Sequence, residues 1–150
     1  MEPDDPLTRL VAIEEIKQLK ARYFRCMDTR RWDDMASVFA RDAHLDTDGF
    51  TADGRDGIIA FLQRVLRDAR TVHHGHMPEI TITSATTARG IWAMFDYVEF
   101  VSADPSDTTP RGLYGYGHYE EEYVVEDQAW RIATLRLTRL RVDPLPGGLG

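Results

Sequence analysis

The hydrophobic pattern of this 150-residue chain changes its period near Thr71, and that change limits the folds open to it. Before this point, apolar residues recur every three or four positions in three expected helices, 5–27, 32–39 and 57–67. A short strand is expected over 43–47. After this point, apolar and polar residues alternate in four expected strands, 79–83, 89–101, 114–125 and 130–142. Helices followed by a meander of strands predict an α+β fold, in which helices cover one side of a mostly antiparallel sheet.

The chain length and the boundary signals favour one domain. Asp5 is a residue type that caps helices and Pro6 is tolerated in a first turn, so the first helix is expected to begin there. The chain has no internal repeat, and we interpret it as a single domain, 1–150, with a core over 7–142. The tail 143–150 is rich in proline and glycine, and we expect it to be flexible.

The charge balance limits the partners. A formal net charge of −7 argues against nucleic acid, because a phosphate-rich partner would attract basic residues onto one face. No segment approaches the roughly 20 apolar residues that span a bilayer, and the acidic N-terminus is unlike a secretory signal. The single cysteine, Cys26, lies on an apolar helix face, where we expect a buried, reduced thiol. These features predict a cytoplasmic protein without a membrane partner.

Four arginines follow a run of glutamates near the C-terminus. The arginines are Arg131, Arg136, Arg139 and Arg141, and the glutamates are Glu120, Glu121 and Glu122. Because both sets lie in expected strands, we interpret them as cross-strand ion pairs.

The expected strand 89–101 is apolar on both faces. One face carries Trp92, Met94, Val98 and Phe100, and the other carries Ile91, Ala93, Phe95, Tyr97 and Val101. Helices can cover only one of these faces, so the other is expected to meet another subunit. This pattern predicts a homo-oligomer, a dimer or a trimer.

Asp96 interrupts one apolar face of that strand, between Met94 and Val98. A buried carboxylate needs a hydrogen-bonded or charged neighbour, because burial without one is costly. Asp96 therefore indicates either a structural pair with an arginine or a polar group inside a pocket.

Three of the five histidines lie together at the start of the sheet, at His73, His74 and His76. Imidazole is suited to proton transfer near neutral pH, so one of them is a candidate acid or base. The alternatives are ordinary surface histidines and a zinc site. Alternation turns His73 away from His74, and no cysteine or carboxylate lies at ligand spacing, so no metal is expected.

Tyr23 and Asp28 lie near the end of the first expected helix. Tyr23 completes the apolar face and carries a hydroxyl into it, which favours a hydrogen-bonding role at the mouth of a pocket. Asp28 either ends the helix in a turn with Thr29 or belongs to the same pocket.

A series of short motifs occurs in order over residues 7–141. They are 12–16, Tyr23, Asp28, 32–34, 39–43, 71–80, the strand around Asp96, 117–119 and 130–132. This series resembles the SnoaL-like proteins of the nuclear transport factor 2-like superfamily, and most closely the bile-acid 7α-dehydratases and scytalone dehydratases. The resemblance implies a cone-shaped barrel of a curved, mixed and mostly antiparallel sheet wrapped around N-terminal helices.

The resemblance also implies a set of site residues. By position, it places catalytic roles on Tyr23, Asp28, His73, Asp96 and Arg139. The chain departs from the common pattern at Met77, where many relatives have asparagine, and at His118, where an arginine is common. The apolar residues predict a substrate pocket lined by Phe61, Leu62, Trp92, Met94, Val98, His118 and Trp130.

The function implied is that of a dehydratase, a lyase acting by general acid–base elimination on a hydrophobic, polycyclic carbonyl substrate. His73, oriented by Asp28, would move the proton, and Tyr23 would donate a hydrogen bond. Asp96 would position the substrate hydroxyl or hold the histidine, and Arg139 would hold the polar or anionic end of the substrate. Two alternatives stay open, an isomerase or polyketide cyclase with the same residues and a non-catalytic binding or assembly module.

No cofactor is expected for this chemistry. The chain has no glycine-rich phosphate loop between a strand and a helix, and Gly115 and Gly117 lie within an expected strand. We therefore interpret these two glycines as structural.

Overall fold

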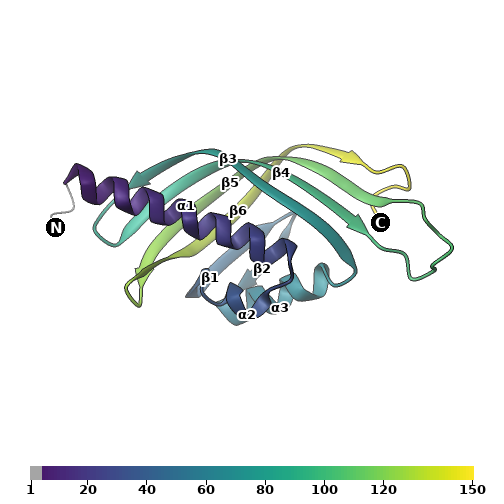
Figure 1. Cartoon of the computed structure of the whole chain (residues 1–150), viewed down its shortest axis with the longest axis horizontal. Helices are drawn as coiled ribbons and strands as arrows, with labels where there is room; N and C mark the ends of the chain where they lie inside the picture. The colour runs from purple at the N-terminus through teal and green to yellow at the C-terminus, as the bar shows by residue number, and fades with distance from the viewer. Residues whose placement is uncertain (1–4) are drawn as a thin grey trace.

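The computed structural model describes residues 5–150 and shows three helices against one face of a curved six-stranded sheet (Figure 1). The helices are α1 (Pro6–Asp28), α2 (Trp32–Met35) and α3 (Arg55–Val65). The strands are β1 (Phe39–Thr47), β2 (Phe50–Asp53), β3 (Ala69–Ile82), β4 (Thr87–Phe100), β5 (Arg111–Glu126) and β6 (Ala129–Pro144). No helix among residues 5–150 is both long and apolar enough to cross a bilayer.

The strand order is β2-β1-β6-β5-β4-β3, and only the β1–β6 pair is parallel among the described strands. The predicted α+β class with a mixed, mostly antiparallel curved sheet is confirmed. Over residues 5–150 the sheet does not close into a barrel, so β2 and β3 form its two edges. The edge position of β3 matters for the site, because β3 carries His73.

Helix α1 begins and ends at residues that suit its termini. Asp5 caps the helix by accepting a hydrogen bond from the N–H of Thr8 at 3.0 Å, and Pro6 occupies the first turn. The helix ends at Asp28, and Arg30 then takes a positive φ of 60° that turns the chain away. This ending leaves the Asp28 carboxylate beside β3.

The buried face of α1 starts later than the sequence pattern predicts. Leu7, Leu10 and Val11 are exposed, because the first turns of the helix extend beyond the sheet (Figure 1). The buried residues of α1 are Ala12, Ile16, Leu19, Lys20, Tyr23, Cys26 and Met27. The predicted burial of Cys26 is confirmed, and the buried Lys20 is a departure from the expected apolar face.

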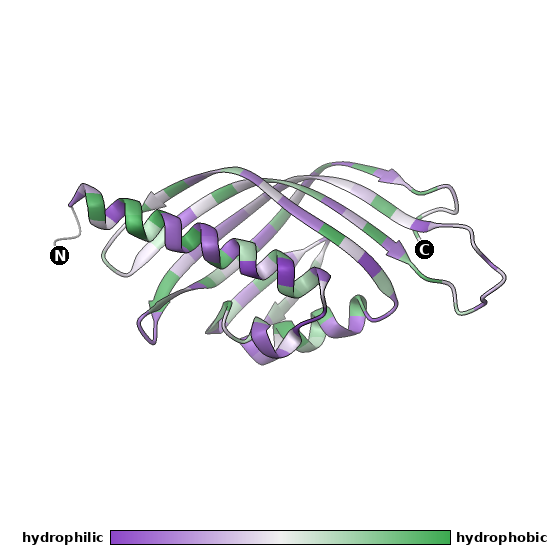
Figure 2. Ribbon diagram, in the orientation of Figure 1, coloured by the Kyte–Doolittle hydropathy of each residue, from purple (hydrophilic) through white to green (hydrophobic). Residues whose placement is uncertain are grey.

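Strand β4 alternates between the core and the outer face. Its even-numbered residues from Ala88 to Val98 are buried against the helices, including Asp96. Its odd-numbered residues face away from the helices and include the exposed Ile91. Figure 2 shows hydrophobic and hydrophilic residues alternating along the strands, as this two-faced arrangement requires.

Two predicted segments take other conformations. The expected helix over 32–39 stops at Met35, and β1 begins at Phe39 rather than at residue 43. Strand β2 has no counterpart in the prediction. It pairs with β1 through a two-residue turn, Asp48-Gly49, in which both φ angles are positive, 50° and 82°.

The tail expected to be flexible is instead packed. Pro144 ends β6 and Leu145 is buried. Main-chain hydrogen bonds join the tail to the start of β5, from the N–H of Leu145 to the carbonyl of Gly112 and from the N–H of Gly112 to the carbonyl of Gly148. These hydrogen bonds overcome the local preference of a segment rich in proline and glycine.

The predicted cross-strand arrangement of the C-terminal arginines and Glu120–Glu122 is present at one position, where Glu120 lies opposite Arg136, but no ion pair joins the two sets within residues 5–150. Within residues 5–150, Arg139 pairs with Asp48 and Asp96, and Arg141 pairs with Asp143. Glu121 faces the core on β5, where it meets a lysine of α1. The period of the strand explains the inward position of Glu121, since adjacent residues of a strand point to opposite faces.

Candidate active site

A cavity of about 260 Å³ lies between the helices and the inner face of the sheet. Its walls are mainly apolar and come from α1, α3 and every strand of the sheet. The polar side chains in the lining are Tyr23, Thr47, Asp48, His73, Asp96, Tyr119 and Arg139. Four of the five residues implied by the resemblance therefore surround one space, and the fifth, Asp28, lies directly behind His73.

His73 and Asp28 form a hydrogen-bonded pair. The ring Nδ1 of His73 lies 2.7 Å from Oδ1 of Asp28, and the histidine is only 8% exposed. An ionised carboxylate can only accept hydrogen bonds, so Nδ1 of His73 donates to Asp28, and in the neutral imidazole Nε2 keeps its lone pair. Nε2 has no hydrogen-bond partner among residues 5–150, which leaves it free to act as a base on a molecule in the cavity.

Asp28 is itself held by several donors. Its Oδ2 accepts the backbone N–H of His73 at 2.9 Å, and its Oδ1 accepts the Thr71 hydroxyl at 3.0 Å. The hydroxyl oxygen of Thr71 accepts in turn from Arg30, 3.0 Å away. These contacts fix the carboxylate, and through it the orientation of the imidazole ring.

The position of β3 at the sheet edge makes this arrangement possible. The N–H of His73 points away from β4, where a further strand would otherwise lie, and Asp28 accepts it. One carboxylate therefore binds both the main chain and the ring of the same histidine. His74, the next residue, faces outward and packs near Phe95, as the alternation predicts.

Asp96 and Arg139 form a bidentate ion pair on the cavity wall. Nη1 and Nη2 of Arg139 each lie 2.9 Å from one carboxylate oxygen of Asp96, which is 2% exposed. The third guanidinium nitrogen, Nε, donates to Asp48 at 2.7 Å. Every nitrogen of Arg139 is thus already bonded within the protein, which argues against the expected role of holding an anionic substrate group.

The same contacts keep Arg139 charged. Burial alone would lower the pKa of its guanidinium, but the hydrogen bonds and charges of Asp96 and Asp48 raise that pKa above its ordinary value. Two carboxylates share this one guanidinium, so the cluster carries an excess of one negative charge.

Because Gly115 has no side chain, it leaves room for this ion pair. It lies opposite Asp96 on β5, and a Cβ atom at this position would come within 1.9 Å of Nη1 of Arg139 and 2.1 Å of Oδ1 of Asp96. The structural interpretation of Gly115 therefore has a specific cause, since any side chain would displace the pair.

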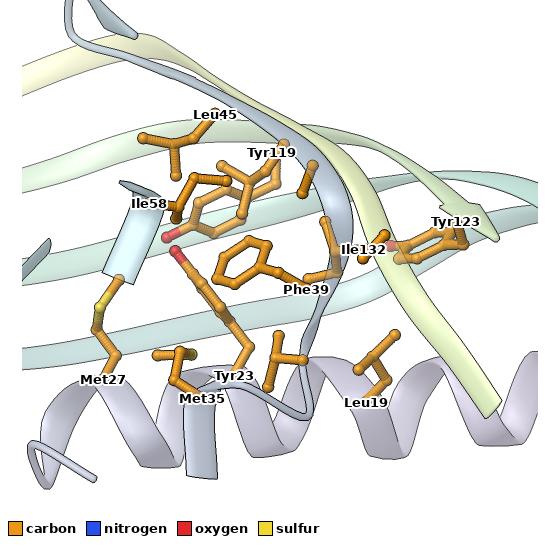
Figure 3. Close-up of a cluster of buried hydrophobic side chains, with 14 of the residues drawn as sticks. Leu19, Tyr23, Met27, Met35, Phe39, Leu45, Ile58, Tyr119, Tyr123 and Ile132 are labelled. Carbon is orange, nitrogen blue, oxygen red and sulfur yellow. The ribbon is translucent and has the colours of Figure 1, made fainter. Parts of the chain in front are cut away.

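Two tyrosine hydroxyls meet at the inner end of the cavity. Figure 3 shows the hydroxyl groups of Tyr23 and Tyr119 pointing toward one another from α1 and β5. Burial, reinforced by nearby carboxylates, raises the pKa of both phenols above the ordinary value. Both hydroxyls therefore stay protonated and are available as hydrogen-bond donors. Tyr119 and Asp48 were not among the predicted site residues.

The predicted apolar lining is partly present. Phe61, Leu62 and Val98 line the cavity. Trp92 and Met94 face the same side of β4 but are packed in the core, where the indole of Trp92 donates to the Tyr123 hydroxyl at 2.8 Å. The hydrogen bond between the two aromatic side chains explains why Trp92 does not reach the cavity.

Two further predicted pocket residues lie elsewhere. Trp130 is buried beside Val11 and Leu19 of α1, away from the cavity. His118 alternates with the inward-facing Tyr119 and so lies on the outer face of the sheet. The predicted cavity lining is therefore wrong at four positions, which are Trp92, Met94, His118 and Trp130.

No group of three or more histidine, cysteine, aspartate or glutamate side chains within residues 5–150 has a geometry that could hold a metal ion. The carboxylates of the site instead bond to His73 and to Arg139. The arrangement provides one base, a fixed ion pair and two neutral donors around an apolar space, which suits proton transfer at a carbon atom.

Residues 8–136 match the family model of the SnoaL-like domain. The fold is similar to that of a type 2 hexachlorocyclohexane dehydrochlorinase (LinA), with a TM-score of 0.81 and 23% identity over 96% of this chain and 95% of that one. A Novosphingobium aromaticivorans protein described as a scytalone dehydratase has a TM-score of 0.78 and 22% identity, over 91% of this chain and 89% of its own. A variant of Rv3472, a Mycobacterium tuberculosis protein of unknown function, has a TM-score of 0.73 and 25% identity, over 89% of this chain and 74% of its own.

At the level of fold, the chain is similar to these proteins. The family match extends over most of the sequence, and the chain belongs to the SnoaL-like family.

Proposed function

We propose that this protein is a cofactor-independent lyase that eliminates water from a small, neutral and hydrophobic β-hydroxy carbonyl compound. The observation that carries the proposal is the Asp28–His73 pair on the wall of an apolar cavity, in which Nδ1 is bonded to the carboxylate and the neutral ring would offer Nε2 as a base. A base in such a site needs no metal to remove a proton from carbon if the resulting charge is stabilised by nearby donors.

In the proposed reaction, Nε2 of His73 takes the proton from the carbon next to the substrate carbonyl. The electron pair of that C–H bond forms the enolate, and its oxygen receives hydrogen bonds from the hydroxyls of Tyr23 and Tyr119. The enolate then expels the β-hydroxyl group, which takes the proton back from His73 and leaves as water. The product is an α,β-unsaturated carbonyl compound, and the enzyme returns to its starting protonation state.

The charge of the site supports a neutral substrate. Asp48 and Asp96 outweigh Arg139 by one negative charge, and Asp28 adds another behind His73. An anionic group in this cavity would meet the carboxylates of Asp48 and Asp96, whose shared cation, Arg139, is already bonded to both. In this proposal Asp96 and Arg139 shape the wall and position the substrate hydroxyl.

The size of the cavity supports a compact substrate. Its volume of about 260 Å³ lies just below the roughly 300–1,000 Å³ typical of small-molecule sites. We therefore favour a substrate of one or two rings over the larger polycyclic compounds expected from the sequence. Phe61, Val98 and the other apolar lining residues would contact such rings.

The names of two structural neighbours agree with a lyase. A dehydrochlorinase eliminates hydrogen chloride and a dehydratase eliminates water, so both names describe eliminations. These similarities show the fold, and the proposal for this chain depends on its own His73 and Asp28.

The proposal is tested by incubating the protein with neutral β-hydroxy ketones of one, two and four rings. Dehydration is followed by the new ultraviolet absorbance of the conjugated product. We expect His73→Ala to reduce turnover by about 100-fold or more, because the base is lost. The matched control is His74→Ala, one position along β3 on the opposite face, which should keep the wild-type rate.

Three results would contradict the proposal. One is wild-type turnover by His73→Ala, and another is equal turnover of carboxylate-bearing analogues, which the charge of the site disfavours. The third is a product in which the hydroxyl group is retained and a double bond has moved. That product would identify an isomerase with the same proton shuttle.

We further propose that the outer face of the sheet joins copies of this chain into a dimer or trimer. That face exposes apolar residues of several strands, namely Val72, Ile91, Tyr114 and Tyr116. Phe95 and Tyr97 lie among them on β4. Contiguous apolar surface of this kind is typical of protein interfaces.

A further inference from the structure

A fully buried ion pair lies behind the two cavity tyrosines. Lys20 of α1 and Glu121 of β5 are paired through Nζ and Oε1, and neither side chain is exposed. Lysine and glutamate are rarely buried completely, and replacing such a pair by apolar residues of similar size often leaves stability unchanged. Stability alone therefore does not account for this pair.

The ammonium group of Lys20 is surrounded by aromatic faces. Nζ lies 3.7 Å from the ring centroid of Tyr119, 4.1 Å from that of Tyr23 and 4.8 Å from that of Phe24. A cation within about 6 Å of a ring face is attracted by the π electrons, and the attraction is strongest where water is excluded. Two of these three rings carry the hydroxyls that point into the cavity.

The negative partner is held on the far side. Glu121 also accepts the Tyr123 hydroxyl, and that hydroxyl accepts the indole N–H of Trp92. Along β5, the inward-facing order from the cavity is Tyr119, Glu121 and then Tyr123. The charge of Glu121 raises the pKa of both phenols, and the ammonium group of Lys20, which lies directly against the two rings, opposes that effect.

We propose that Lys20 is a positioning residue for the donors Tyr23 and Tyr119. Its charge fixes the orientation of both rings and strengthens their hydroxyls as hydrogen-bond donors, because a cation on the ring face stabilises negative charge arriving at the phenol oxygen. This inference rests on the proposed function, in which those hydroxyls stabilise an enolate. Lys20 itself does not touch the substrate.

The test uses a double variant, Lys20→Met with Glu121→Leu, which removes both charges and keeps similar side-chain volumes. We expect it to fold, with kcat lowered about tenfold and KM little changed, since only transition-state stabilisation is lost. The ¹³C NMR resonances of the ring ζ carbons of Tyr23 and Tyr119 should shift, while that of the outer-face Tyr114 should not. The matched control is Lys17→Met with Glu14→Leu, an exposed pair on the same helix.

The spectroscopic measurement separates this inference from the proposed function. If no substrate is turned over but both tyrosine resonances shift, the lyase proposal fails and the polarising role of Lys20 stands. If the double variant folds and keeps the wild-type resonances and kcat, Lys20 is only structural. If the double variant does not fold, ¹⁵N NMR of wild-type Lys20 decides, because a neutral amine at neutral pH would overturn the inference.

Discussion

Gly115 shows how a missing side chain shapes the site. We expect Gly115→Ala to lower stability by about 3 kcal/mol, the cost of separating a buried ion pair, because its Cβ would enter the space of Arg139 and Asp96. Thermal or urea unfolding measures the effect. Gly57→Ala is the control, since its Cβ has open space in α3 and should add up to about 1 kcal/mol of stability. Equal unfolding midpoints for the two variants would contradict this prediction.

Asp28→Asn tests the orientation of His73. An amide can donate as well as accept, so the ring would no longer be restricted to the form with a proton on Nδ1. We expect a loss in kcat of about 100-fold, with the histidine tautomers mixed in ¹⁵N NMR spectra. Wild-type tautomer populations together with wild-type kcat would count against the Asp28–His73 pair as the functional unit.

The sequence predicts most of the residues of the site, but it predicts few of the contacts between them. Asp96 is conspicuous because it is a charge on an apolar strand face, and alternation correctly separates His73 from His74. Lys20, Tyr119 and Asp48 gave no such signal. A lysine on a helix is normally solvated, and only the register between α1 and β5 brings Lys20 to Glu121.

At the scale of elements, α1 begins at a titratable cap. The hydrogen bond from the Thr8 N–H lowers the pKa of Asp5, so the cap stabilises the helix above the ordinary aspartate pKa and loses this effect as pH falls through the lowered value. We expect Asp5→Ala to lower Tm at pH 7 but to match the wild type near pH 2. Asp5→Asn should retain a cap at both pH values. An equal Tm decrease at both pH values for Asp5→Ala would contradict the prediction.

Most of the long elements are predicted from the sequence, but β3 is expected only as the strand 79–83 and the four-residue β2 is not predicted. Helix α1 and strands β4, β5 and β6 have enough residues for their hydrophobic period to be distinct. Strand β2 has four residues and is largely exposed, so no apolar alternation marks it. The C-terminal tail depends on main-chain hydrogen bonds to Gly112, and such contacts are independent of the local sequence pattern.

At the scale of the whole molecule, the helix-then-strand order was sufficient to predict the α+β class, but the open sheet edges were not evident from it. Whether the sheet closes into a barrel depends on how the edge strands β2 and β3 lie relative to one another, and no local sequence pattern predicts this. The same limit applies to the cavity, since Trp130 and Trp92 are apolar and buried yet contact other parts of the core.

The proposed assembly is tested through the outer face. We expect the wild-type protein to be a dimer or trimer by light scattering at micromolar concentration, and Phe95→Glu to shift it to the monomer, because a charge on this face opposes burial. Leu10→Glu, an exposed position on α1, is the control and should not change the mass. A monomeric wild-type protein would refute the assembly.

The position of His73 on an edge strand has a consequence for how this protein could change over time. Asp28 accepts the main-chain N–H of His73, which would otherwise be free to pair with a strand of another molecule. Losing the imidazole ring would end the proposed catalysis and leave that hydrogen bond intact, whereas losing the carboxylate would also expose the edge of the sheet and favour aggregation. A descendant that kept only a binding role would therefore be expected to discard the histidine side chain before the aspartate.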